Sequence, residues 1–188
     1  MTHTQHLITA AMAAFSVSGG AVLAATTAEP APAAQATTWQ HHHVSFEYHG
    51  FTTLYSCDGL EDKVHSILLF MGARPGVKVR ADGCPRGPQS PSHMAYVTAD
   101  FDTLAAMSDV AAGSAVEAQW TAFKLDAQRP FFMGAGDCEL MESMRSVLTK
   151  SFTLRNLAYE THCTPHELSF ADYSVTGQVL KTAAAHSG

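Results

Sequence analysis

The sequence has few basic residues, and those it has are scattered. Lys and Arg together number 11 against 17 Asp and Glu, which gives a formal net charge of −6 with histidine neutral. A nucleic-acid interface needs clustered Lys and Arg to meet the phosphates, so the sequence predicts no nucleic-acid partner. An anionic membrane surface is disfavoured for the same reason.

Sequence motifs of common enzyme classes are also missing. The chain has no G-x-S-x-G, no P-loop, no dinucleotide fingerprint, no H-E-x-x-H and no Cys-x-x-Cys. The sequence therefore assigns no catalytic residue and favours a non-enzymatic protein. A small exported hydrolase remains an alternative, because catalytic groups can converge in space without a local motif.

Long apolar runs are absent after the N-terminal segment. Residues 7–24 are apolar, small and uncharged, and end in Val22-Leu23-Ala24, which resembles a signal-peptide cleavage site. We expect a signal peptide over residues 1–24, with an uncleaved anchor as the alternative, and no membrane span after cleavage. The expected location is the periplasm or the extracellular space.

The rest of the chain has the length of one domain. Residues 25–40 are rich in Ala, Thr and Pro and predict a disordered leader. Residues 41–181 then form a single α+β domain, and residues 182–188 a frayed tail.

Four cysteines are present, and their spacing suggests two disulfide bonds. Cys57 and Cys84 are 27 residues apart, and Cys138 and Cys163 are 25 apart. An even number of cysteines in an exported chain implies a disulfide framework. Each pair brackets an expected helix and the strand after it, so we expect Cys57–Cys84 and Cys138–Cys163, each stabilising the fold by about 3 kcal/mol.

Apolar periodicity places one helix after the first cysteine of each pair. The first helix begins near Asp58, an expected N-cap, and stops at Gly72. The second follows Asp137. Each has an apolar residue at most positions of one helical face, namely Leu60, Val64, Ile67, Leu68 and Met71 in the first, and Leu140, Met141, Met144, Val147 and Leu148 in the second.

The order of elements repeats, and this repetition sets the predicted fold class. Each half reads as strand, helix, strand and cysteine, with further strands expected over residues 94–106, 118–126 and the segment after Cys163. The sequence therefore predicts an α+β sandwich of the split β-α-β, ferredoxin-like type, built from a pseudo-repeat of two β-α-β units. Another α/β sandwich with its helices on one face is the alternative.

Histidine is conspicuous among the polar residues, with 11 in the chain. Imidazole binds Cu(II), Ni(II) and Zn(II), so a metal site is one interpretation. Adjacent residues of a strand point to opposite faces, however, so three successive histidines do not make one site. The candidate ligands are His41, His42, His43, His49, His162 and His166.

The function expected from the sequence is binding rather than catalysis. We expect an exported domain whose partner is another periplasmic or extracellular protein, and no cofactor. The alternatives are a periplasmic protein that binds Cu, Zn or Ni through the histidines, and the small exported hydrolase. The ligand itself is not indicated by any motif.

Overall fold

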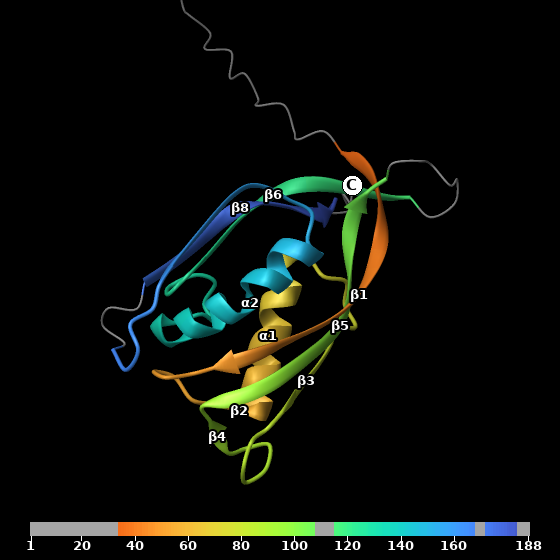
Figure 1. Ribbon diagram of the computed structural model, residues 1–188. Coiled ribbons are helices and arrows are strands. Elements are labelled where there is room, and N and C mark those ends of the chain that lie inside the picture. Colours follow the sequence, from red (N-terminus) through yellow and green to blue (C-terminus); the bar gives the residue numbers. More distant parts are fainter. Residues whose placement is uncertain (1–33, 108–114, 168–171, 184–188) are drawn as a thin grey trace, which may run out of the picture. The chain divides into compact units, whose positions relative to one another are not determined.

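The computed structural model describes residues 34–107, 115–167 and 172–183. A six-stranded sheet in the order β3-β5-β1-β6-β8-β7 and two helices make up this region (Figure 1). A 3-10 turn, Ala135–Asp137, precedes the second helix, and a separate ladder joins β2 (Tyr55–Ser56) to β4 (Pro91–Ser92). The principal elements are β1 (Gln35–His49), α1 (Cys57–Met71), β3 (Lys78–Asp82), β5 (Met94–Ala106), β6 (Val116–Asp126), α2 (Cys138–Ser151), β7 (Leu154–His162) and β8 (Asp172–Thr182).

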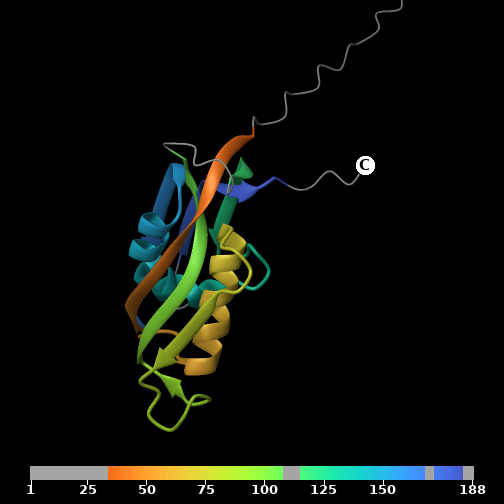
Figure 2. The ribbon, with the colours of Figure 1, turned by 90° about the vertical axis from the view of Figure 1, so that its right-hand side faces the viewer.

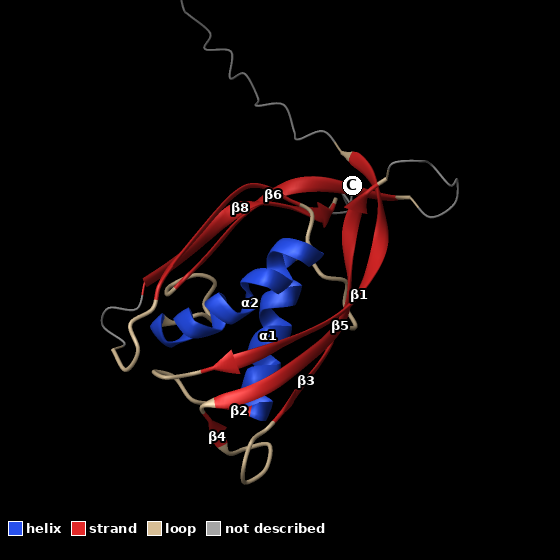
Figure 3. Ribbon diagram, in the orientation of Figure 1, coloured by secondary structure: helices blue, strands red, loops and turns tan. Residues whose placement is uncertain are grey.

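The sheet consists of two three-stranded halves. β1 pairs with β5 along almost its whole length, whereas its pairing with β6 is confined to Gln35, Ala36 and Thr37. All neighbouring strands are antiparallel. Both helices lie inside the bend of the sheet, between the half β3–β5–β1 and the half β6–β8–β7 (Figure 3). The opposite, outer face of β3–β5–β1 therefore carries no helix in the described region.

In the described residues, the topology confirms a mixed α+β fold with an antiparallel sheet, two helices and two disulfide bonds. β1 and β3 flank α1 in the chain, but β5 lies between them in the sheet. Likewise, β8 lies between β6 and β7, the strands that flank α2. The ferredoxin-like pseudo-repeat is not confirmed by this six-stranded arrangement.

α1 forms where the sequence predicts it, but with a different N-cap. Ser56, rather than Asp58, is the N-cap, and its hydroxyl oxygen accepts the N–H of Gly59 at 3.1 Å. Helix formation begins at Cys57, one residue before the expected cap. At the other end, Gly72 has φ 103°, the left-handed conformation that glycine adopts without strain, and its N–H bonds the last carbonyls of the helix.

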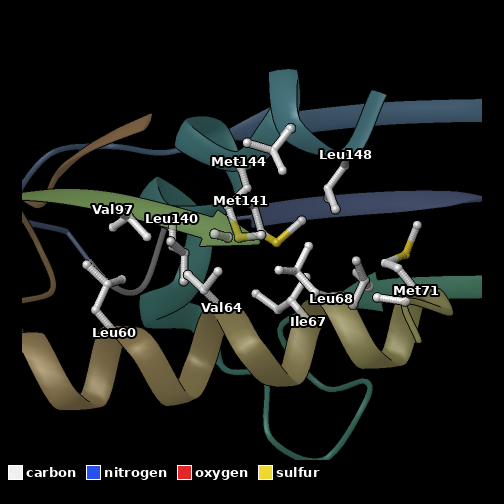
Figure 4. Close-up of a cluster of buried hydrophobic side chains, with 14 of the residues drawn as sticks. Leu60, Val64, Ile67, Leu68, Met71, Val97, Leu140, Met141, Met144 and Leu148 are labelled. Carbon is white, nitrogen blue, oxygen red and sulfur yellow. The ribbon is translucent and has the colours of Figure 1, made fainter. Parts of the chain in front are cut away.

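The hydrophobic core lies between the two helices and the inner face of the sheet. The predicted apolar face of α1 is wholly buried and points toward Leu140, Met141 and Met144 of α2 (Figure 4). Val97 of β5 and Val175 of β8 complete this core from the two sheet halves. Burying each such side chain contributes about 1.5–3 kcal/mol, so this interface is the main source of stability.

Each disulfide bond joins the first residue of a helix to the segment after the next strand. Cys57 of α1 bonds Cys84 beyond β3, with 6.0 Å between the Cα atoms. Cys138 of α2 bonds Cys163 beyond β7, with 5.7 Å between the Cα atoms. These are the same pairs as the sequence predicts.

The domain boundaries differ from those expected at both ends. The leader was expected to reach Gln40, but β1 already begins at Gln35, because these residues pair with β5 and β6. Thr37 is fully buried, and its hydroxyl donates to the Val116 carbonyl at 2.7 Å. At the C-terminus, Thr182, which was expected in the frayed tail, still belongs to β8. The expected signal peptide, residues 25–33 of the expected leader and residues 184–188 of the expected tail lie outside the described residues.

Candidate functional site

Two surface features on the half β3–β5–β1 are candidate binding sites: a groove between α1 and β3, and two His–Asp pairs on the outer face. The groove has a volume of about 460 Å³. α1 lies beside β3, which is the last strand of the sheet on this side (Figure 2). The residues that line the groove are Glu61, Asp62 and His65 of α1, and Val77, Lys78, Val79 and Arg80 of β3 and the turn before it.

The free edge of β3 faces this groove. The Ala81 N–H points away from β5, since it donates to Glu61 Oε1 at 2.9 Å. Alternate residues of an antiparallel strand direct their backbone groups to the same side, so the N–H and C=O of Val79 also point away from β5. Within the described residues, these two groups of Val79 have no backbone partner.

Charges on the two sides of the groove are of opposite sign. Glu61 and Asp62 project from the helix, whereas Lys78 and Arg80 are exposed side chains of the strand. The Cys57–Cys84 bond ties the start of α1 to the end of β3 and so fastens these two walls together. An open strand edge beside a helix is the geometry that accepts an extended peptide as an additional strand.

The outer face of β1 and β5 carries two cross-strand His–Asp pairs. His41 lies opposite Asp102, with His41 Nδ1 3.0 Å from Asp102 Oδ1. His43 lies opposite Asp100, with His43 Nδ1 2.8 Å from Asp100 Oδ1. The hydrogen bond from His43 lowers the pKa of the Asp100 carboxyl below its ordinary value. Both imidazoles are about two-thirds exposed, at 66% and 67% of the side chain.

His42, between these two residues, points to the inner face of the sheet. Its Nε2 lies 2.9 Å from Thr103 Oγ1, and its ring packs against Phe101 with 5.5 Å between centroids. Burial lowers the pKa of His42, so the neutral ring is favoured. The side chains of the three adjacent histidines therefore alternate between the two faces of β1.

The other candidate metal ligands are dispersed. His49 contacts Glu47, with His49 Nε2 3.2 Å from Glu47 Oε2. His166 follows the second disulfide, and its ring packs edge-on against Phe51. His162 ends β7, beside a cysteine that is already in a disulfide. Among the described residues, no group of three or more His, Cys, Asp or Glu side chains is arranged to hold a metal ion.

The N-terminus of α2 carries buried charges that hold the fold together. The Glu139 carboxylate accepts the N–H groups of Phe51 and Thr52 at 3.0 Å each and so fixes the loop between β1 and β2. Asp137 accepts bonds from Tyr55 and Gly134 and pairs with Lys63 at 3.0 Å. These contacts satisfy the buried carboxylates, and their role is structural.

The hydrolase alternative requires a nucleophile beside a histidine and an acidic residue. His41, Asp100 and Asp102 line a cavity of about 160 Å³, together with Arg74, Lys78 and three other residues. Among the residues that the structure describes, no Ser, Thr or Cys lines this cavity, and its volume is below the usual 300–1,000 Å³ of small-molecule sites. This cavity does not provide the arrangement that the hydrolase alternative needs.

Sequence reasoning missed the residues that define the groove. The sequence alone explains Glu61 and Asp62 as acidic residues near a helix N-terminus. In the structure, however, the Glu61 carboxylate accepts a hydrogen bond from the N–H of Ala81 in β3, 20 residues away. No local signal marks β3 as an edge strand, since that position follows from the insertion of β5 beside β1.

No model of a known protein family, no curated protein and no solved structure matches this chain. The chain thus takes no function from a relative. Within the described residues, no helix is long and apolar enough to cross a membrane. The groove and the His–Asp pairs are therefore the features on which a function can be built.

Proposed function

We propose that this protein is an exported, non-enzymatic binding domain that holds an extended segment of a periplasmic or extracellular protein partner in the α1–β3 groove. The observation that carries the proposal is the free edge of β3 at Val79, which faces a groove of about 460 Å³. A peptide that lies along this edge gains backbone hydrogen bonds, which do not depend on its sequence.

Specificity in this proposal comes from the charges on both sides of the added strand. Successive side chains of a strand point to opposite faces. On the helix side they meet Glu61 and Asp62, and on the outer side they meet Lys78 and Arg80. The preferred partner segment therefore alternates basic and acidic side chains from one residue to the next.

The proposed location outside the cytoplasm is supported by the two disulfide bonds, which persist in oxidising compartments. The apolar segment over residues 7–24, within the expected signal peptide, supports the same location. The intact mass of protein isolated from its own compartment without reductant tests this. We expect a mass four hydrogens below that of the reduced chain; free thiols would contradict the proposal.

A peptide-display selection with two variants at one position tests the groove. Random 12-residue peptides are selected against the immobilised chain, and the selected sequences are assayed on Val79→Pro and Val79→Ala. Proline removes the N–H that points into the groove and is tolerated on an edge strand, whereas alanine keeps that N–H. Both variants lose the valine side chain, so alanine is the matched control.

We expect the selected peptides to bind Val79→Pro about ten-fold or more weakly than Val79→Ala, equivalent to one lost backbone hydrogen bond and the steric effect of the ring. They should also be rich in alternating charges. Equal binding to both variants would overturn the groove as the site. A chain that dimerises through paired β3 edges in the absence of peptide would equally contradict the proposal.

We also propose that residues 35–106 and 116–182 are a pseudo-repeat. Each contains a strand, a helix that begins at a cysteine, a strand that ends before the bonded cysteine, and a strand that returns between the first two. An experimental structure that places β5 and β8 differently relative to α1 and α2 would contradict this.

A further inference from the structure

Among the described residues, no hydrogen bond engages the Nε2 atoms of His41 and His43, the two histidines of the His–Asp pairs. His41 and His43 are on the same face of β1, two residues apart, which places their Cα atoms about 6.5–7 Å from one another. In each pair the Nδ1 atom faces a carboxylate of β5. An ionised carboxylate only accepts hydrogen bonds, so Nδ1 of each neutral ring is the donor and carries the hydrogen, and each Nε2 keeps its lone pair.

This arrangement is the one found around many metal-binding histidines. A histidine that ligates a metal usually donates its other ring N–H to a carboxylate or carbonyl, which fixes its tautomer and makes the ligand more basic. Here both members of a His-x-His sequence have such a carboxylate, Asp102 for His41 and Asp100 for His43. His49 is exposed on the same face of β1, but it contacts Glu47 of its own strand through Nε2, the nitrogen that a metal would need.

We propose that His41 and His43 bind one divalent transition-metal ion through their Nε2 atoms, with Asp100 and Asp102 as positioning residues. Imidazole ligands and the order of metal affinities favour Cu²⁺ over Ni²⁺ and Zn²⁺. The site has two protein ligands, and water completes the coordination. This agrees with the described residues, where no three candidate ligands converge.

Nearby charges bear on the strength of this site. Asp100 Oδ1 lies 3.9 Å from His41 Nε2, so the carboxylate adds negative charge beside the ion. Lys78 of β3 lies opposite Asp100, and Arg74 lines the same small cavity, which opposes that effect. Because the negative and positive charges partly cancel and the surface is exposed, the site has a moderate affinity for the ion. Such a site exchanges its ion rather than retaining it permanently.

Copper titration of the full chain without a polyhistidine tag, followed by calorimetry and native mass spectrometry, tests the proposal. We expect one bound Cu²⁺ per chain with moderate affinity, and a loss of affinity of about ten-fold or more in both His41→Ala and His43→Ala. The double variant should bind no more weakly than either single variant, because one ion needs both rings. His49→Ala is the matched control and should bind as the unchanged chain does.

The positioning role has a readout of its own. Nitrogen-15 spectra of the metal-free protein should show His41 and His43 with hydrogen on Nδ1. Asp100→Asn and Asp102→Asn should each weaken Cu²⁺ binding about 10–100-fold with the fold intact by circular dichroism. Hydrogen on Nε2 in both rings, or an affinity unchanged in His41→Ala, would overturn the site. Since Val79→Pro does not touch these residues, metal binding and peptide binding can fail independently.

Discussion

Replacing Glu139 by glutamine should destabilise the protein and release the loop between β1 and β2. Glu139 is 6% exposed, and its carboxylate accepts two backbone N–H groups at 3.0 Å and the hydroxyl of Thr52 at 3.1 Å. Hydrogen bonds to a charged group contribute about 1.5–3 kcal/mol each. Glutamine keeps one acceptor oxygen but turns an NH₂ group toward backbone donors. We therefore expect a loss of about 3 kcal/mol in the free energy of unfolding.

Urea unfolding of the oxidised protein measures this loss, and hydrogen exchange locates it. The amide hydrogens of Phe51 and Thr52 should exchange much faster in Glu139→Gln than in the unchanged chain. Glu142→Gln is the control, because Glu142 is exposed on the same helix. If the two variants unfold within 0.5 kcal/mol of each other, Glu139 does not hold the loop as described.

Three further predictions concern close packing, the first disulfide and alkaline pH. Gly50→Ala should cost more than 2 kcal/mol in urea unfolding, since its Cβ would lie 2.2 Å from the Thr53 carbonyl oxygen, whereas Gly134→Ala has open space and should cost far less. Removing the Cys57–Cys84 bond should lower the free energy of unfolding by about 3 kcal/mol and also weaken peptide binding. Removing the Cys138–Cys163 bond should lower the free energy of unfolding alone. If both variants lost the same peptide affinity, the first bond would not be what holds the two walls of the groove together. Burial raises the pKa of four tyrosines, so their hydroxyl groups stay protonated in the folded state. In the unfolded chain the same hydroxyl groups lose their protons near pH 10. Stability should therefore fall above that pH by about 1.4 kcal/mol per tyrosine and pH unit, and a flat profile from pH 9 to 11 would contradict the burial of Tyr48, Tyr55, Tyr159 and Tyr173.

Local patterns were sufficient to predict the helices and the cysteine pairs. The apolar residues of α1 recur at helical spacing, and all five of those predicted are buried. Each cysteine pair spans one helix and one strand, so the order of elements alone brings its members to one end of the sheet. Gly72 ends α1 as expected because the left-handed C-cap favours glycine.

Features that depend on pairing between distant strands could not be predicted. The pairing of His43 with Asp100 follows from the register of β1 against β5, which separates the two residues by 57 positions in the sequence. A shift of one residue would have moved every imidazole to the other face. The ends of β1 and β8 were missed for a similar reason, since Ala- and Thr-rich segments with a linker-like composition pair with strands far along the chain.

The central claim, that a partner peptide joins the sheet at β3, is tested most directly by amide hydrogen exchange with and without a selected peptide. The Val79 N–H faces the groove and should exchange rapidly in the free protein, then slow by about ten-fold or more when the peptide binds. Arg80 pairs toward β5, so its amide hydrogen should be protected in both states and serves as the internal control. A peptide that binds while Val79 exchanges at an unchanged rate would contradict strand addition at this edge.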